Sequence, residues 1–141
     1  MTGRNENTTA PHGAGTGQVP GSLSVELEAD GRTRVLVLSG ELDYGSASVL
    51  REWMGRALDA DGVHVVVDCA GLTFCDSAGL NVLVGARSIA VDRGAALTLA
   101  AVQPSVERVL EMSGVDTIVA VRATRREALD RVPPAGPGES G

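Results

Sequence analysis

Apolar and polar positions follow two different periods along this chain, and the change of period separates predicted strands from predicted helices. Every second residue of 23–29 is apolar, and after a turn-forming segment a second run, 34–40, is rich in branched side chains. These two runs predict a hairpin of strands. Residues 63–68 are rich in valine without alternation, which is typical of a strand buried on both faces and predicts a central place in the sheet.

Apolar residues at helical spacing predict four helices among and after these strands. Their expected places are from Ser46 onward, over 78–94, over 103–114 and over 124–132. Gly94 and Gly114 are available to end the second and third helices, and Thr124 with Glu127 has the spacing of a capping box. The residues expected to face the core are Ala47, Leu50, Met54, Ala57 and Leu58 in the first helix, Leu80, Leu83, Val84 and Ala90 in the second, and Val106, Val109 and Leu110 in the third.

Two further apolar runs, 95–102 and 117–121, predict the remaining strands, so strands and helices alternate after the hairpin. Parallel neighbours need crossover connections, and the predicted fold class is therefore α/β, with a mixed sheet covered by about four helices. Residues 1–22 and 133–141 hold little that could be buried and are expected to be flexible tails. The expected folded domain is 23–132.

The composition of the chain limits its partners and its compartment. The formal net charge is −6 over 141 residues, which argues against a nucleic-acid or anionic-membrane surface and favours a protein partner. All 12 basic residues are arginine. No apolar stretch resembles a secretory signal or reaches the length of a membrane span, so we expect a soluble cytoplasmic protein. Cys69 and Cys75 are too few for a disulfide scaffold and lack zinc-site spacing, so small buried thiols are expected.

Most chemistry that an α/β domain of this size could carry is disfavoured by the residues present. A nucleotide-binding P-loop needs a lysine, and the chain has none. A phosphoacceptor receiver would gather Asp43, Asp68 and Asp76 at one edge of the sheet, but it also uses a lysine. Neither His12 nor His64 is placed to act as a base beside a nucleophile. We therefore expect no catalytic residue, cofactor or metal.

The stretch "LTFCDSAGLNVL", residues 72–83, holds the most informative polar residues. Asp76 is a good N-cap, which places Ser77 in the first helical turn, where the helix dipole favours an anion. Gly79 lacks a side chain and is expected to leave room for a protein to approach the Ser77 hydroxyl. The pattern alone leaves two interpretations open for Ser77, an ordinary capping residue or a phosphorylation site.

The same residues resemble a known family. "DCAGLTFCDSAGL", residues 68–80, is similar to the signature of the STAS domain of bacterial anti-sigma factor antagonists. "LSGELDYGSASVLREWM", residues 38–54, resembles the Gly-Glu-Leu-Asp segment and following helix of that family, and "VQPSVERVLEMSGV", residues 102–115, resembles its Pro-x-Val-x-Arg-Val helix. The resemblance covers the whole of 23–132 with the elements in family order, and it implies a STAS fold.

The resemblance also implies a function. It makes Ser77 the phosphoacceptor of a separate anti-sigma factor, a serine kinase that carries ATP and Mg²⁺, and places Asp43, Asp76, Ser77, Ala78 and Gly79 in the partner-binding surface. The unphosphorylated protein would bind the anti-sigma factor and so release a sigma factor for transcription, as in stress-response or sporulation control. A phosphatase of PP2C type would reset the switch. The protein itself would not be an enzyme.

Small departures and one alternative accompany this interpretation. Ser48 stands where many relatives have proline, and Met112 replaces a usual leucine. Trp53 and Val49 lie toward the flank of the first helix, where they would cover the core or, less favourably, contact a partner. The alternative function on the same fold is a scaffold subunit of a larger stress-signalling complex. A receiver-like domain that is phosphorylated on an aspartate is the least favoured of the functions considered.

Overall fold

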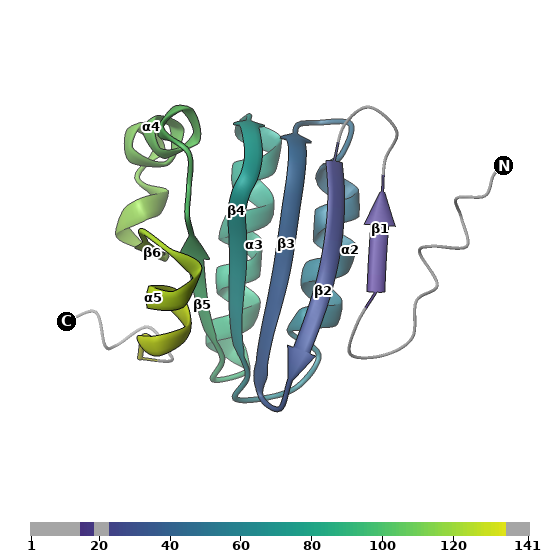
Figure 1. The fold of residues 1–141 in the computed structure, drawn as a ribbon, viewed down its shortest axis with the longest axis vertical. Helices are drawn as coiled ribbons and strands as arrows, with labels where there is room; N and C mark the ends of the chain where they lie inside the picture. Colours follow the sequence, from purple (N-terminus) through teal and green to yellow (C-terminus); the bar gives the residue numbers. More distant parts are fainter. Residues whose placement is uncertain (1–14, 19–22, 135–141) are drawn as a thin grey trace, which may run out of the picture.

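A six-stranded mixed sheet, with its strands in sequence order from β1 to β6, organises the protein (Figure 1). The computed structural model describes residues 15–18 and 23–134, with side chains described from residue 23 onward. The strands are β1 (Gly15–Gln18), β2 (Leu23–Asp30), β3 (Thr33–Leu42), β4 (His64–Cys75), β5 (Ala96–Ala100) and β6 (Ala120–Arg122).

The predicted hairpin is confirmed, because β2 and β3 pair antiparallel and connect through Gly31, whose φ of 63° suits a glycine in a tight turn. The alternating residues Leu23, Val25 and Leu27 of β2 are all buried. Strand β1 adds to the other side of β2, with Gly15 opposite Leu27. The expectation of a flexible tail over 1–22 is therefore wrong for the four residues of β1, since strand pairing uses main-chain groups and needs no apolar side chain. The rest of that segment lies outside the described residues.

In the part of the chain that the structure describes, four α-helices cover the sheet: α2 (Ala47–Ala57), α3 (Ser77–Asp92), α4 (Pro104–Ser113) and α5 (Arg125–Asp130), with a 3₁₀ turn, η1, at Val115–Thr117. Helices α2 and α3 lie behind the sheet in Figure 1, α5 crosses its front, and α4 sits at the end where β4 finishes. Within residues 15–18 and 23–134, no helix has both the length and the apolar character needed to cross a bilayer. The α/β class with about four helices is confirmed.

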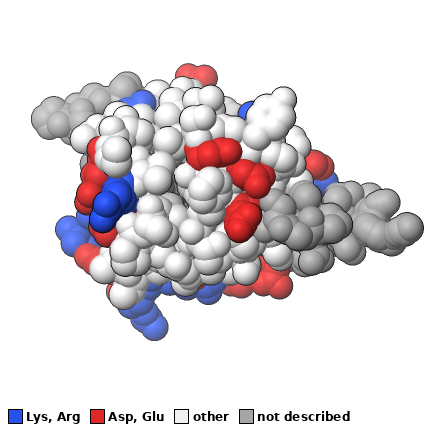
Figure 2. All heavy atoms as spheres, turned by 90° about the horizontal axis from the view of Figure 1, so that it is seen from above, with Lys and Arg blue, Asp and Glu red and all other residues white. Residues whose placement is uncertain are grey.

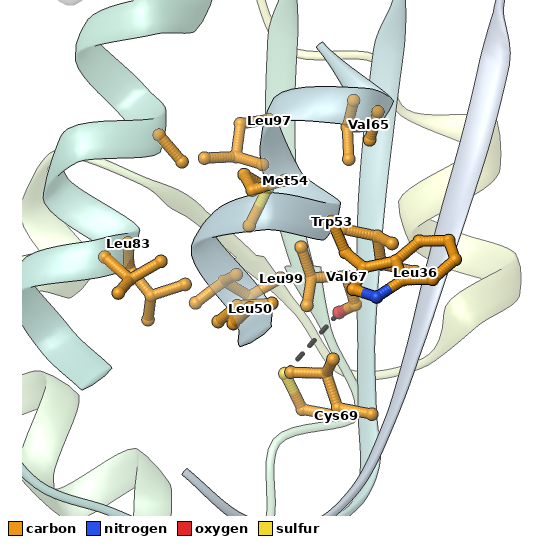
Figure 3. Close-up of a cluster of buried hydrophobic side chains, with 14 of the residues drawn as sticks. Leu36, Leu50, Trp53, Met54, Val65, Val67, Cys69, Leu83, Leu97 and Leu99 are labelled. Carbon is orange, nitrogen blue, oxygen red and sulfur yellow. Dashed lines mark hydrogen bonds between the residues drawn. The ribbon is translucent and has the colours of Figure 1, made fainter. Parts of the chain in front are cut away.

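The main core fills the space between the sheet and helices α2 and α3 (Figure 3). Trp53 is 1% exposed and is packed in this core, which confirms the favoured expectation that it covers the core rather than contacting a partner. Val49 is half-buried and packs against the same cluster. A smaller cluster of Val35, Val66, Ala100 and Ala128 lies under α5 on the opposite face of the sheet.

The inward face of α3 differs from the predicted one. Leu83 and Ala90 are buried as expected, but Val84 is exposed and its place in the core is taken by Gly79, Val82 and Ala86. The exposed side of this helix mixes the apolar Val84 and Ile89 with polar residues such as Asn81 and Ser88, and a helix with apolar residues on more than one side does not reveal from its sequence which of them will be buried. In α4, Val106 and Leu110 are buried and Val109 is half-buried.

Strand lengths differ from the prediction, whereas helix ends agree with it. Strand β4 is central, as expected, but runs on past residue 68 to Cys75 through two register shifts against β3. Strand β6 is shorter than 117–121 because η1 occupies the residues before it. Gly94 and Gly114 both have positive φ just after α3 and α4, and the Thr124 hydroxyl accepts from Glu127 N at 3.0 Å.

Candidate functional site

The site lies at the end of the molecule where the parallel strands β3 and β4 finish and helices α2 and α3 begin, at the top of Figure 1. The last paired residues are Leu42 of β3 and Cys75 of β4. Asp43 and Asp76 follow these residues directly, and the Asp76 N–H donates to the Leu42 carbonyl at 3.1 Å. The two strand ends thereby bring Asp43 and Asp76, which are 33 positions apart in the chain, to the same edge of the sheet.

Asp76 is the N-cap of α3, as predicted, and it also holds a second segment. Its Oδ1 accepts hydrogen bonds from Ala78 N at 2.9 Å and from Gly79 N at 3.1 Å. Its Oδ2 accepts from Tyr44 N at 3.1 Å, in the turn between β3 and α2. One carboxylate therefore fixes both the start of α3 and the neighbouring turn.

Ser77 is the first residue of α3, and its side chain is exposed. The main-chain N–H groups of Ala78 and Gly79 are already bonded to Asp76. The expected support for an anion at this helix start is therefore reduced, because these two N–H groups are not available to bind a phosphate. A phosphate on Ser77 would project outward beside the Asp76 carboxylate.

Asp43 belongs to a compact turn that the sequence analysis did not identify. The fully buried Ser46 hydroxyl donates to the Glu41 carbonyl at 3.0 Å and contacts Asp43 Oδ1 at 3.1 Å. In return, Ser46 Oγ accepts from Asp43 N at 2.9 Å, and Asp43 Oδ1 accepts from Ser46 N at 3.1 Å. An Asp followed three residues later by Ser is a turn-forming pattern, so this part of the site was readable from sequence.

Gly79 does not leave room for a partner, and that expectation is wrong. The residue is buried, and a Cβ built on it would lie 2.6 Å from Leu42 Cγ, 2.8 Å from Leu42 Cδ2 and 2.9 Å from Cys75 Sγ. Gly79 instead allows the first turn of α3 to pack closely on the ends of β3 and β4. Ala78 is half-buried and packs against the main core.

The surface of this end is acidic. Figure 2 looks down on it and shows carboxylate side chains gathered near its centre, with arginines towards the margins. Glu41, Asp43 and Asp76 lie at the strand and helix ends that form this surface. Asp68 does not join them, because its Oδ2 accepts from Arg125 Nε at 3.0 Å where β4 pairs with β5. The trio of aspartates expected of a receiver is therefore not assembled.

Other reactive groups of the described residues are held in unreactive settings. Burial raises the pKa of Cys69 to about 12 and that of Cys75 to about 11, so both thiols stay protonated at neutral pH. His64 is buried, with its Nε2 3.1 Å from the Thr98 hydroxyl. Among residues 15–18 and 23–134, no three His, Cys, Asp or Glu side chains are grouped so that they could hold a metal ion.

Two aromatic residues at this end were not assigned to the site from sequence. Tyr44, in the turn after β3, is 87% exposed, and Phe74, next to the last residue of β4, is 47% exposed. The chain has only three aromatic residues, and the third, Trp53, is in the core. The only signal for Tyr44 and Phe74 in the sequence was their position: two of the three aromatic residues of the chain lie within two residues of Asp43 or Asp76.

Comparisons of the sequence and of the fold with known proteins agree with the arrangement of strands and helices described above. The STAS domain family matches residues 24–128. An anti-sigma F factor antagonist from Paenibacillus polymyxa is 31% identical over 109 residues, which is 77% of this chain and 93% of the relative. The solved structure of the anti-sigma factor antagonist SpoIIAA in its unphosphorylated form is 30% identical, with a TM-score of 0.62 over 76% of this chain and 94% of that one. The phosphorylated form of the Bacillus cell fate determinant SpoIIAA is 28% identical, with a TM-score of 0.58 over 76% of this chain and 97% of that one. The chain belongs to the STAS domain family.

Proposed function

We propose that this protein is an anti-sigma factor antagonist controlled by phosphorylation of Ser77. The unphosphorylated protein binds an anti-sigma factor that is also a serine kinase, and this binding releases a sigma factor. The observation that carries the proposal is the exposed Ser77 hydroxyl at the start of α3, beside the Asp76 carboxylate. The names of the relatives, and the two solved forms of SpoIIAA, support the same assignment.

The geometry of the site supports the direction of the switch. A phosphate adds about −1.5 to −2 charges at neutral pH. On Ser77 this charge would stand beside Asp76 on an acidic surface, and the amides of Ala78 and Gly79 are already bonded to Asp76. Repulsion between the phosphate and the carboxylates, together with the cost of removing the phosphate from water, weakens binding to a partner. The switch needs no refolding of the domain.

The phosphoryl-transfer chemistry belongs to the partner in this scheme. The kinase carries ATP and Mg²⁺, and a separate phosphatase of PP2C type removes the phosphate. The antagonist contributes only the acceptor hydroxyl and a binding surface, so we assign it no catalytic residue and place it in the cytoplasm with its partners.

The first experiment recovers the partner and identifies the modified residue. The Ser77→Ala variant is used as bait in a lysate of the host, and the retained kinase is purified and incubated with the wild-type protein and MgATP. Mass spectrometry is expected to find phosphate on Ser77. The matched control is Ser105→Ala, which removes another exposed serine hydroxyl from the first turn of a helix, α4, and is expected to leave phosphorylation unchanged. Phosphate elsewhere, with Ser77 unmodified, would contradict the proposal.

The second experiment tests the electrostatic mechanism. Ser77→Ala is expected to bind the purified anti-sigma factor as tightly as the wild-type protein, even with ATP present, because it cannot be phosphorylated. Ser77→Asp places a negative charge at the same position and is expected to bind poorly. Equal affinities of these two variants would show that charge at residue 77 does not control binding.

A further inference from the structure

Tyr44 presents a large side chain to solvent at the site although no function has been assigned to it. Its side chain is 87% exposed, and the residue lies in the turn between β3 and α2, one position after Asp43. An aromatic ring in this position contributes little to folding because it is in contact mostly with water. The ring is therefore available to another protein.

The backbone under Tyr44 is held from both sides. Its own N–H donates to Asp76 Oδ2 at 3.1 Å, which ties it to the start of α3. On either side of it, Asp43 and Ser46 exchange hydrogen bonds of 2.9 Å and 3.1 Å, and Ser46 is fully buried. A side chain carried by a rigid turn loses less conformational freedom on binding than one carried by a mobile loop.

The surroundings of Tyr44 indicate the chemistry of its partner. Tyrosine is among the residues that most often carry the binding energy of protein interfaces, with its ring in an apolar pocket and its hydroxyl bonded at the edge. Asp43 and Asp76 flank the turn and Glu41 precedes it. A complementary surface therefore has an apolar pocket with arginine or lysine at its rim, where these cations can also contact the face of the ring.

We propose that Tyr44 is the main anchor through which the unphosphorylated protein binds its anti-sigma factor, and that the ring enters an apolar pocket bordered by basic residues. This inference rests on the proposed function, because it names a residue that sets affinity for the same partner. Since Asp76 holds the Tyr44 turn and also starts the helix that carries Ser77, the anchor and the phosphorylation site form one surface. A phosphate on Ser77 then lies at the edge of the contact that Tyr44 makes.

The test compares three variants in binding to the purified anti-sigma factor, measured by calorimetry without ATP. Tyr44→Ala is expected to weaken binding about 30-fold or more, as truncation of an anchoring residue does. Tyr44→Phe keeps the ring and is expected to stay within about threefold of wild type. Ile89→Ala is the matched control, because Ile89 is 40% exposed but lies twelve residues beyond Ser77 in α3, about 18 Å along the helix from the site, and it is expected to bind like wild type.

Kinetics of phosphorylation separate an anchor from a residue that only maintains the fold. Tyr44→Ala is expected to raise the KM of the kinase for this protein with little change in kcat, and Ser77 is expected to remain the modified residue. Urea unfolding is expected to give the wild-type midpoint, because the side chain is exposed. Wild-type affinity and KM for Tyr44→Ala would overturn the inference while leaving the proposed function intact. If the wild-type protein itself neither binds the anti-sigma factor nor is phosphorylated by it, the proposed function fails instead.

Discussion

Replacing Gly79 by alanine tests whether close packing of α3 on the strand ends is what the site requires of this residue. The added Cβ would lie 2.6 Å from Leu42 Cγ and 2.9 Å from Cys75 Sγ, and both of those side chains are buried. Leu42 Cγ is a branch point near the backbone, so it cannot move aside as the end of a flexible chain can. Overpacking of this kind costs about 1–3 kcal/mol. Alanine regains at most about 1 kcal/mol through its higher helix propensity.

Because three atoms lie under 3.0 Å from the added Cβ, we expect the upper part of this range, about 2–3 kcal/mol, so the net loss for Gly79→Ala is about 1–2 kcal/mol of unfolding free energy. Gly85→Ala is the matched control in the same helix, because a Cβ at residue 85 has no atom within 4 Å, and it is expected to gain up to about 1 kcal/mol. Urea unfolding followed by circular dichroism measures the unfolding free energy of both variants. The values are compared where m, the dependence of that free energy on urea concentration, is unchanged. The two glycine substitutions should differ in sign.

A double variant identifies the cause of the loss. Leu42→Ala alone leaves a cavity, but it also removes two of the three atoms that the Cβ of residue 79 would meet, the third being Cys75 Sγ. The double variant Gly79→Ala/Leu42→Ala is therefore expected to lose less stability than the sum of the two single losses. Equal stability of Gly79→Ala and Gly85→Ala, or strict additivity in the double variant, would refute the packing explanation.

Two further predictions concern other buried or strained positions. Burial lowers the pKa of His64 below its ordinary value, so below about pH 6.5 the unfolded chain binds a proton that the folded protein does not. Stability is therefore expected to fall as pH decreases from 7.5 to 5. The urea midpoint of the His64→Phe variant, measured at both pH values, is expected to fall less than that of the wild type. Ala101 has a φ of 58°, which is unfavourable for any residue with a side chain. Ala101→Gly is expected to raise the unfolding free energy by about 0.5–1 kcal/mol, and an unchanged or lower urea midpoint would argue against strain at this residue.

Local chemistry was enough to predict much of this fold. The alternation in β2, the glycines that end α3 and α4, and the caps at Asp76 and Thr124 depend on interactions within a few residues, and all are present in the structure. The α/β class follows from the order of these elements. The position of Ser77 in the first turn of α3 could also be predicted, because an N-cap determines which residue comes next.

The other features of the fold and of the site depend on contacts between segments that are far apart in the chain. The sequence by itself could not show that Gly79 meets Leu42 or that Asp76 holds Tyr44, because the partners in each case come from different elements. The continuation of β4 to residue 75 likewise depends on pairing with β3, which lies more than 30 positions earlier in the chain. Sequence patterns report the preferences of neighbouring residues, whereas the site is formed where β3, β4 and α3 meet in space. Its acidic surface and its exposed tyrosine are therefore properties of the tertiary structure.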